Sequence, residues 1–309
     1  MGLLASASGA AQDFPTKPIL LVVPAAAGGI TDVAARIIAD KMKDTLGQPL
    51  VVENVVGGNL TIGSRRVARA NPDGYTFMAG TTTSHAAIQG LMKSVPYDPL
   101  ADFKPVGMVG YAYQMLIISK TLPAANLKEL VQYGKANPGK ISFGAGSASA
   151  RLAAASFGKA VGIEMQHVPY KANVQAVTDT AGGHIQLMFA EAQAMLPAVQ
   201  DGRVRAIAVA GSARTPLAPS TPTLKELGVA DVDMIPWMGF FAPAGVPDPI
   251  VDKLNHALRD AMVQKDVQEK LAGLGFEPAN MTPRETRDFQ VKEVAKWMAG
   301  LREAGIVPE

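Results

Sequence analysis

The stretch Lys17-Pro-Ile-Leu-Leu-Val-Val-Pro-Ala-Ala-Ala-Gly-Gly-Ile-Thr-Asp-Val-Ala-Ala-Arg36 decides the fold that we predict for this chain. Its apolar run from Ile19 to Val23 is rich in β-branched residues and lies between two prolines, which is typical of a buried parallel strand. A small, flexible turn follows, and apolar residues recur at helical spacing after Thr31, a suitable N-cap residue. The sequence therefore predicts a strand, a glycine turn and a helix in immediate succession.

The turn between this strand and this helix is a candidate anion site. The first amides of a helix have no partner within the helix, and the helix dipole adds to their preference for negative charge. The glycines could equally serve only to reverse the chain, but loops at strand carboxyl ends are the usual ligand positions in open α/β sheets. No Gly-Lys-Ser/Thr follows the glycines, so the turn is not a P-loop.

Composition indicates a folded globular protein. The chain has 309 residues, of which 48% are hydrophobic and 18% charged, and this length is enough for two domains with separate cores. The net charge of +2 excludes a strongly basic nucleic-acid surface and gives no electrostatic reason for membrane binding. The absence of cysteine excludes disulfides, thiolate catalysis and cysteine-ligated zinc.

The N-terminal segment, residues 1–13, is small and apolar and contains signal-cleavage options such as Ser8-Gly9-Ala10. We interpret it either as the remnant of a secretory signal peptide or as a tail left by a tag. No later apolar run reaches the roughly 18 residues of a transmembrane helix, so none is predicted.

Strands and helices alternate along the rest of the chain. We expect further strands near residues 49–53, 75–79, 115–119, 141–143, 167–170, 185–189, 204–209 and 237–242. We expect helices near residues 61–70, 127–136, 151–161, 173–181, 192–199, 249–263, 266–273 and 283–303, and irregular chain at 95–99 and 102–105. The pattern predicts an α/β fold of two wound lobes joined by two crossings, a clamshell. Residues 14–112 and 238–309 would form the first, discontinuous lobe and residues 113–237 the second.

A second loop of small residues, Gly144-Ala-Gly-Ser-Ala-Ser-Ala150, stands in the second lobe where the glycine turn stands in the first. If the lobes face each other, both loops point into one cleft. Each helix N-terminus could then capture one carboxylate through its amides and through the hydroxyls of Thr31, Ser147 and Ser149. Ligand sites are common at such domain interfaces.

The sequence offers little support for catalysis. The four histidines, His85, His167, His184 and His256, lie far apart and show no metal-binding spacing. The second loop matches the nucleophile elbow of hydrolases only in part. It also matches the glycine fingerprint of dinucleotide-binding proteins only in part, and Glu164 is the one acidic residue near the position, about 20 residues later, where such a site requires one. Neither loop contains paired carboxylates. We therefore expect no catalytic residue, metal or cofactor, and keep a nucleotide-cofactor-dependent α/β enzyme as the alternative.

The chain resembles the extracytoplasmic substrate-binding receptors of tripartite tricarboxylate transporters, the Bug family, over about residues 14–306. The matching segments, in order, are Phe14-Pro-Thr-Lys-Pro-Ile19, Gly28-Gly-Ile-Thr-Asp32, Val51-Val-Glu-Asn54, Asn71-Pro-Asp-Gly-Tyr75, Pro96-Tyr-Asp-Pro99, Asp102-Phe-Lys-Pro-Val106, Ala136-Asn-Pro-Gly139, His167-Val-Pro-Tyr-Lys171, Pro222-Thr223, Trp237-Met-Gly239 and Ala242-Pro-Ala-Gly245. The resemblance implies a type II periplasmic-binding fold that closes on small organic acids.

The resemblance also implies the site. Receptors of this family hold carboxylates with main-chain amides of the two loops, often through bridging waters. The matching residues here are Ala26, Ala27, Gly28, Gly29 and Thr31 in the first loop and Gly146, Ser147, Ala148 and Ser149 in the second. Thr83, Ser84 and His85, after the third strand, match a further contact region, and we add Asp32, Arg151, Tyr170, Ala190 and Glu191 as neighbouring candidates.

Departures from the family pattern bear on the ligand. Ala25-Ala-Ala-Gly-Gly29 lacks the aromatic residue that usually precedes the glycines, which would enlarge the site for a ring-bearing ligand. Arg151 either pairs with a carboxylate or is a solvated residue of a first helical turn. Asp32 suits the helix dipole but would repel an anion unless it held a water, hydroxyl or amine. If Glu191 faces the cleft, its negative charge favours a ligand that carries a hydrogen-bond donor at that end, or a ligand with a single negative charge.

Taken with the resemblance, the sequence predicts a periplasmic, monomeric receptor that delivers a small carboxylate to membrane components of a transporter and performs no chemistry. We expect a dicarboxylate or an aromatic acid such as a phthalate isomer, captured by hinge closure of the lobes. A sensor receptor that passes its ligand-bound state to a signalling partner is the other alternative.

Overall fold

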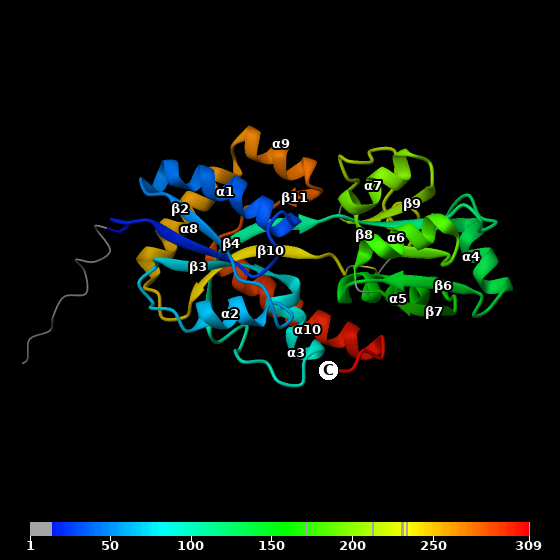
Figure 1. Cartoon of the computed structure of the whole chain (residues 1–309), viewed down its shortest axis with the longest axis horizontal. Coiled ribbons are helices and arrows are strands. Elements are labelled where there is room, and N and C mark those ends of the chain that lie inside the picture. The colour runs from blue at the N-terminus through cyan, green and yellow to red at the C-terminus, as the bar shows by residue number, and fades with distance from the viewer. Residues whose placement is uncertain (1–13, 171, 212, 230–231, 233, 309) are drawn as a thin grey trace, which may run out of the picture.

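The computed structural model describes residues 14–170, 172–211, 213–229, 232 and 234–308, and the N-terminal segment 1–13 lies outside them. The strands form one six-stranded and one five-stranded sheet. Helices cover both sheets, and the two parts lie side by side along the long axis of the molecule (Figure 1). We call the six-stranded sheet with its helices lobe 1 and the five-stranded sheet with its helices lobe 2. The predicted α/β fold of two wound lobes is confirmed.

The sheet of lobe 1 has the strand order β11-β4-β10-β3-β1-β2. Its strands are β1 (Ile19–Val23), β2 (Leu50–Asn54), β3 (Thr76–Thr81), β4 (Phe103–Ala112), β10 (Trp237–Pro243) and β11 (Phe276–Pro278). β1 pairs in parallel with β2 on one side and with β3 on the other. The chain therefore leaves β1 first to one side and then to the other, and the strand order reverses at the carboxyl end of β1.

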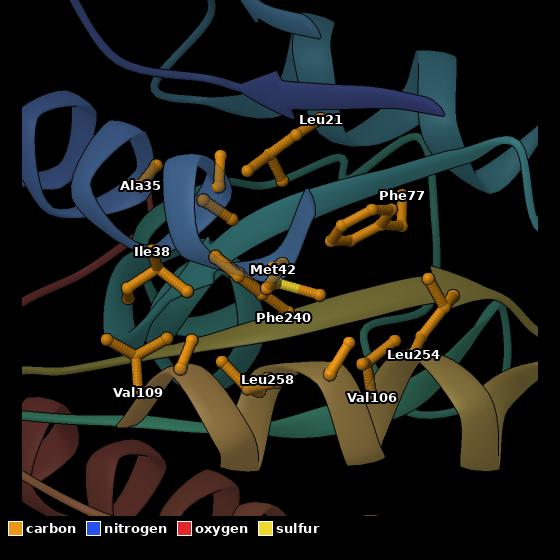
Figure 2. Packing of buried hydrophobic residues seen from close by; sticks show 14 of the residues in the cluster. Leu21, Ala35, Ile38, Met42, Phe77, Val106, Val109, Phe240, Leu254 and Leu258 are labelled. Atoms are coloured by element: carbon orange, nitrogen blue, oxygen red, sulfur yellow. The ribbon is translucent and has the colours of Figure 1, made fainter. Parts of the chain in front are cut away.

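Helices cover the lobe 1 sheet on both faces. The helices α1 (Ile30–Leu46), α8 (Asp248–Met262) and α9 (Lys265–Gly273) share one core with the sheet, and α2 (Thr61–Ala68), α3 (Ile88–Leu91) and α10 (Pro283–Glu303) share the other. Figure 2 shows Ile38 and Met42 of α1 and Leu254 and Leu258 of α8 gathered near Phe240 of the sheet. Burial of each such side chain stabilises the fold by about 1.5–3 kcal/mol relative to exposure.

The sheet of lobe 2 repeats this plan in the order β7-β6-β8-β5-β9. Its strands are β5 (Gln114–Ser119), β6 (Ile141–Ala145), β7 (Met165–Pro169), β8 (Leu187–Glu191) and β9 (Val204–Ala210). One face carries α4 (Leu127–Ala136) and α5 (Ala148–Val161), and the other carries α6 (Asn173–Gly182) and α7 (Ala192–Gln200). β6 pairs in parallel with β7 on one side and β8 on the other, so it stands in lobe 2 where β1 stands in lobe 1.

The first crossing between the lobes runs through Tyr113, the single residue between β4 and β5. Its amide donates to the carbonyl of Gly275 in lobe 1, and its carbonyl accepts from the amide of Ala192 in lobe 2, each at 2.9 Å. The second crossing lies beside it, because the amide of Ala112 donates to the carbonyl of Pro236 at 2.7 Å. Tyr113 is thus the place where main-chain contacts change from one lobe to the other.

Three segments differ from the sequence prediction, and one of them is β11 (Phe276–Pro278), a strand that the sequence analysis did not predict. The expected irregular chain at 102–105 is the start of β4, which Pro105 had concealed. Proline has no amide hydrogen to donate to a neighbouring strand. It is tolerated here because β11 pairs with β4 only from Gly110 to Ala112, so β4 has no neighbour at Pro105 on the β11 side. The chain after β3 continues directly into a short π-helical segment at Thr83–Ala87 and α3. No helix of the described residues has the length and apolarity that a membrane crossing requires.

Candidate ligand-binding site

The two candidate loops occupy equivalent positions. Residues 24–29 follow β1 and lead into α1, and residues 146–147 follow β6 and lead into α5. Figure 1 shows β1 and β6 each running from the outer end of its lobe towards the other lobe, so that both carboxyl ends lie near the junction. In wound sheets, ligands bind outside the carboxyl ends of the strands where the strand order reverses. Both loops stand at such a point.

The first loop is exposed from Ala26 to Gly29. Gly29, and not Thr31 as the sequence suggested, is the N-cap of α1, with an extended backbone at φ −71° and ψ 163°. Its carbonyl accepts the first helical bond, from the amide of Val33 at 3.0 Å. Thr31 lies within the first turn, where the amides have no acceptor inside the helix. These amides are the candidate anion-binding groups of lobe 1.

Asp32 corrects a second expectation. Its carboxylate is buried and accepts hydrogen bonds from the amide of Gly28 at 2.8 Å, from Arg36 Nε at 3.0 Å and from Asn54 Nδ2 at 2.9 Å. Burial favours the neutral acid, but the bonds from Arg36, Gly28 and Asn54 outweigh burial and hold the pKa of Asp32 below its usual value. Asp32 therefore fixes the loop from within, and the Gly28 amide that it binds is not available to a ligand.

The second loop is half-buried from Gly146 to Ser149. Ser147 is the N-cap of α5, where its hydroxyl accepts from the amide of Ala150 at 3.2 Å and lies 3.1 Å from that of Ser149. The helix therefore begins three residues before the start near Arg151 that the sequence predicted. Ala148 is the first residue of the helix.

A residue that the sequence analysis missed, Asn173, ties this loop to the end of β8. Its side chain accepts from the amide of Gly146 at 2.9 Å and donates to Ser147 Oγ at 3.3 Å and to Glu191 Oε2 at 3.1 Å. The available signal was its place shortly after β7, a strand that pairs in parallel with β6. Gly146, Ser147, Asn173 and Glu191 thus form one hydrogen-bonded group at the carboxyl edge of the sheet.

The predicted contact region after β3 lies largely inside lobe 1. Ser84 and His85 are fully buried, and the His85 ring stacks on Phe241 with the ring centroids 4.0 Å apart. Its Nδ1 lies 2.9 Å from Ser84 Oγ. Burial, with the charge of Arg287 as a further cause, lowers the pKa of His85 to about 3. His85 and Ser84 are core residues here, and of this region only Thr83 is partly exposed.

The remaining candidates have different surroundings. Ala190 is completely buried in β8. The Tyr170 hydroxyl donates to Asp179 at 2.7 Å, and burial together with this bond raises the pKa of Tyr170 to about 12. Arg151 is half-buried in the first turn of α5, and its charge adds to burial in lowering the pKa of His167. Among the described residues, no acidic side chain forms an ion pair with Arg151.

Among the described residues, no three His, Cys, Asp or Glu side chains are placed to hold a metal ion. A groove of about 1170 Å³ lies between α4, α5 and α10, but its walls include none of the candidate residues. What the two loops offer is main-chain amides, hydroxyls and one arginine, which is a chemistry suited to binding carboxylates.

Comparison with known proteins agrees with this chemistry. Residues 34–306 match the model of the tripartite tricarboxylate transporter family receptor. The chain is 35% identical to protein BugT of Bordetella pertussis, over 96% of this chain and 91% of that protein.

Two similar solved structures carry carboxylate ligands. One is Rpa4515 of R. palustris with adipate, at 31% identity and a TM-score of 0.82, covering 96% of this chain and 100% of that one. The other is MatC of Rhodopseudomonas palustris with bound malate, at 32% identity and a TM-score of 0.75, covering 93% of this chain and 100% of that one. The chain belongs to the receptor family of the tripartite tricarboxylate transporters.

Proposed function

We propose that this receptor captures a small organic carboxylate between its two lobes and delivers it to the membrane components of a tripartite tricarboxylate transporter. The observation that carries the proposal is the equivalence of the two loops. Each follows the strand at which the order of its sheet reverses, and each opens a helix. One carboxylate group of the ligand would meet amides of residues 26–31 other than those of Gly28 and Gly29, which donate to Asp32 and to the carbonyl of Ala26. A second polar group would meet residues 146–149.

The proposed ligand is a dicarboxylate or an aromatic acid such as a phthalate isomer. Relatives of similar fold bind adipate and malate, which are both dicarboxylates. Ala26 and Ala27 are exposed and small, which leaves room for a ring. Arg151, with no acidic partner in the described chain, supports the pairing with a carboxylate that the sequence left open.

The proposed mechanism is binding with hinge closure and no chemical step. The discontinuous lobe of residues 14–112 and 238–309 would move against residues 113–237 about the crossing at Tyr113. A ligand that touches both loops interacts with the closed state only, so it shifts the population towards closure. The family match supports a receptor in the periplasm, where the transporter components would be its partner. The proposed receptor acts as a monomer.

The test is a thermal-shift screen with aliphatic and aromatic mono- and dicarboxylates and with nicotinamide cofactors. A ligand at about 100 times its Kd stabilises the folded state by about 2.7 kcal/mol, which raises Tm by several degrees. Gly29→Trp should abolish the shift in Tm, because the tryptophan ring would fill the first loop. The φ and ψ angles of Gly29 lie in the extended region, which every amino acid can adopt. Gly273→Trp is the control, since an added Cβ there has no atom within 4 Å.

A carboxylate shift that Gly29→Trp removes and Gly273→Trp retains supports the proposal. The Tm of Gly29→Trp without ligand shows whether this variant is folded. An equal shift in Gly29→Trp and the wild type would contradict the site. A shift caused only by a nicotinamide cofactor would replace the receptor with an enzyme.

A further inference from the structure

We infer that the carboxylate of Glu191 selects carboxylates that also carry a hydrogen-bond donor, either an ammonium or a hydroxyl group. This inference rests on the proposed function, because it assigns selectivity to the lobe 2 half of the same site. It names a residue that determines specificity and narrows the ligand class from all small organic acids to those with a donor group.

The position of Glu191 is the first argument. It ends β8 and is the N-cap residue of α7, yet its side chain does not cap that helix. The side chain is half-buried, and its one hydrogen bond is from Asn173 at 3.1 Å. Among the described residues, no lysine or arginine forms an ion pair with it. A carboxylate offers about four acceptor positions, so most of its capacity remains for a donor from outside.

Asn173 holds this carboxylate next to the loop that binds the ligand. The same side chain accepts from the amide of Gly146 at 2.9 Å and donates to Ser147 Oγ at 3.3 Å. The side chain of Asn173 therefore bridges Glu191 and the N-cap residue Ser147 at the start of α5. A ligand carboxylate seated on the first amides of α5 brings its neighbouring carbon atom, and any substituent on it, towards Glu191.

Gln114 gives a second, independent argument. It is completely buried, and neither its amide nitrogen nor its amide oxygen has a hydrogen-bond partner in the described chain. Strand pairing places Gln114 directly opposite Glu191. Side chains an even number of residues apart on a strand lie on the same face of the sheet. Gln114 therefore shares a face with Leu116, and Glu191 shares a face with Leu187. Because both leucines belong to one core, the Gln114 and Glu191 side chains lie on the same face.

Buried amides in folded proteins nearly always have a partner. A polar ligand group that reaches Glu191 arrives beside the Gln114 amide and can supply this partner. An uncharged, apolar ligand end would leave the Gln114 amide without a partner and would add none to Glu191 beyond Asn173. A second bare carboxylate would meet the negative charge of Glu191. A hydroxyl or ammonium group satisfies both side chains, which is the physical basis of the selectivity.

The test compares ligands that share a skeleton and differ only in the donor. Calorimetric titrations use succinate, malate and aspartate as one set, and phthalate and 4-hydroxyphthalate as another. We expect the donor-bearing member of the bound set to have a Kd at least about tenfold lower, since hydrogen bonds to a charged group have this effect or more. Glu191→Gln, which retains an acceptor for Asn173, should reduce that preference. Glu164→Gln changes an exposed carboxylate of the same lobe and should preserve it.

The outcomes separate the two proposals. Equal binding of succinate, malate and aspartate by the wild type, or an unchanged preference in Glu191→Gln, overturns the role of Glu191 and leaves the receptor function standing. No binding of any carboxylate in either set or in the thermal-shift screen overturns the proposed function itself. The comparison within the wild type decides the inference even if Glu191→Gln does not fold.

Discussion

The main-chain amide of Gly28 donates a hydrogen bond to the buried carboxylate of Asp32 at 2.8 Å, which fixes the first ligand loop from inside the protein. An acidic residue at the start of an anion-binding helix is therefore compatible with an anionic ligand, because Arg36 and Asn54 neutralise and orient it. The remaining amides of the first turn of α1 stay available. The loop is preorganised before any ligand arrives, which lowers the entropic cost of binding.

Asp32→Asn tests this role. The variant loses the ion pair with Arg36 and part of the acceptor capacity for Gly28, so we expect the free energy of unfolding to fall by about 1–3 kcal/mol. Carboxylate affinity should fall as well, because the loop loses its fixed shape. Urea denaturation and calorimetric titration measure the two effects. Asp40→Asn, an exposed change in the same helix, is the control, and equal behaviour of the two variants would contradict the structural role.

His85 should make stability depend on pH. Burial, with the charge of Arg287, lowers its pKa from 6.5 to about 3, so the unfolded chain binds a proton between these values that the folded chain does not. The free energy of unfolding should therefore fall as pH decreases below about 6.5, with a slope of up to about 1.4 kcal/mol per pH unit from this group. Denaturation of the wild type and of His85→Gln at several pH values measures the difference. Identical slopes in both proteins would contradict the buried, neutral state of His85.

Gly146→Ala tests how tightly the second loop is packed. A Cβ at this position would lie 2.7 Å from Ala172 Cα and closer still to the next main-chain atoms. Because backbone cannot move aside as a side chain can, we expect a loss of about 1–3 kcal/mol in stability and weaker ligand binding. Gly273→Ala, where an added Cβ meets nothing within 4 Å, should be neutral or slightly stabilising. A Gly146→Ala protein with wild-type Tm and affinity would show that the loop adapts.

Local patterns allowed much of the fold to be predicted. The run from Ile19 to Val23, the glycine turn and the helix after it were all recognisable, since strand and helix periodicities depend on neighbouring residues alone. The helix after the second loop was likewise recognisable, although it begins at Ala148 and not near Arg151. The alternation of strands and helices also predicted two wound α/β lobes, and the resemblance to the receptor family then supplied the type II periplasmic-binding fold.

What the sequence could not show depends on partners far away along the chain. His85 was a candidate contact because it follows a strand end, but Phe103 and Phe241, which enclose its ring, are distant in sequence. The inward direction of Asp32 depends in part on Asn54, and the group around Glu191 depends on Asn173. Such contacts become visible only when the strands have been placed side by side.

A crystal structure of the receptor with a carboxylate that passes the thermal-shift screen tests the central claim most directly. We predict one ligand molecule whose oxygens accept hydrogen bonds from main-chain amides of residues 26–31 in lobe 1 and from residues 146–149 in lobe 2. A ligand held by one lobe alone, or one lying in the groove between α4, α5 and α10, would contradict a shared site at the two equivalent loops.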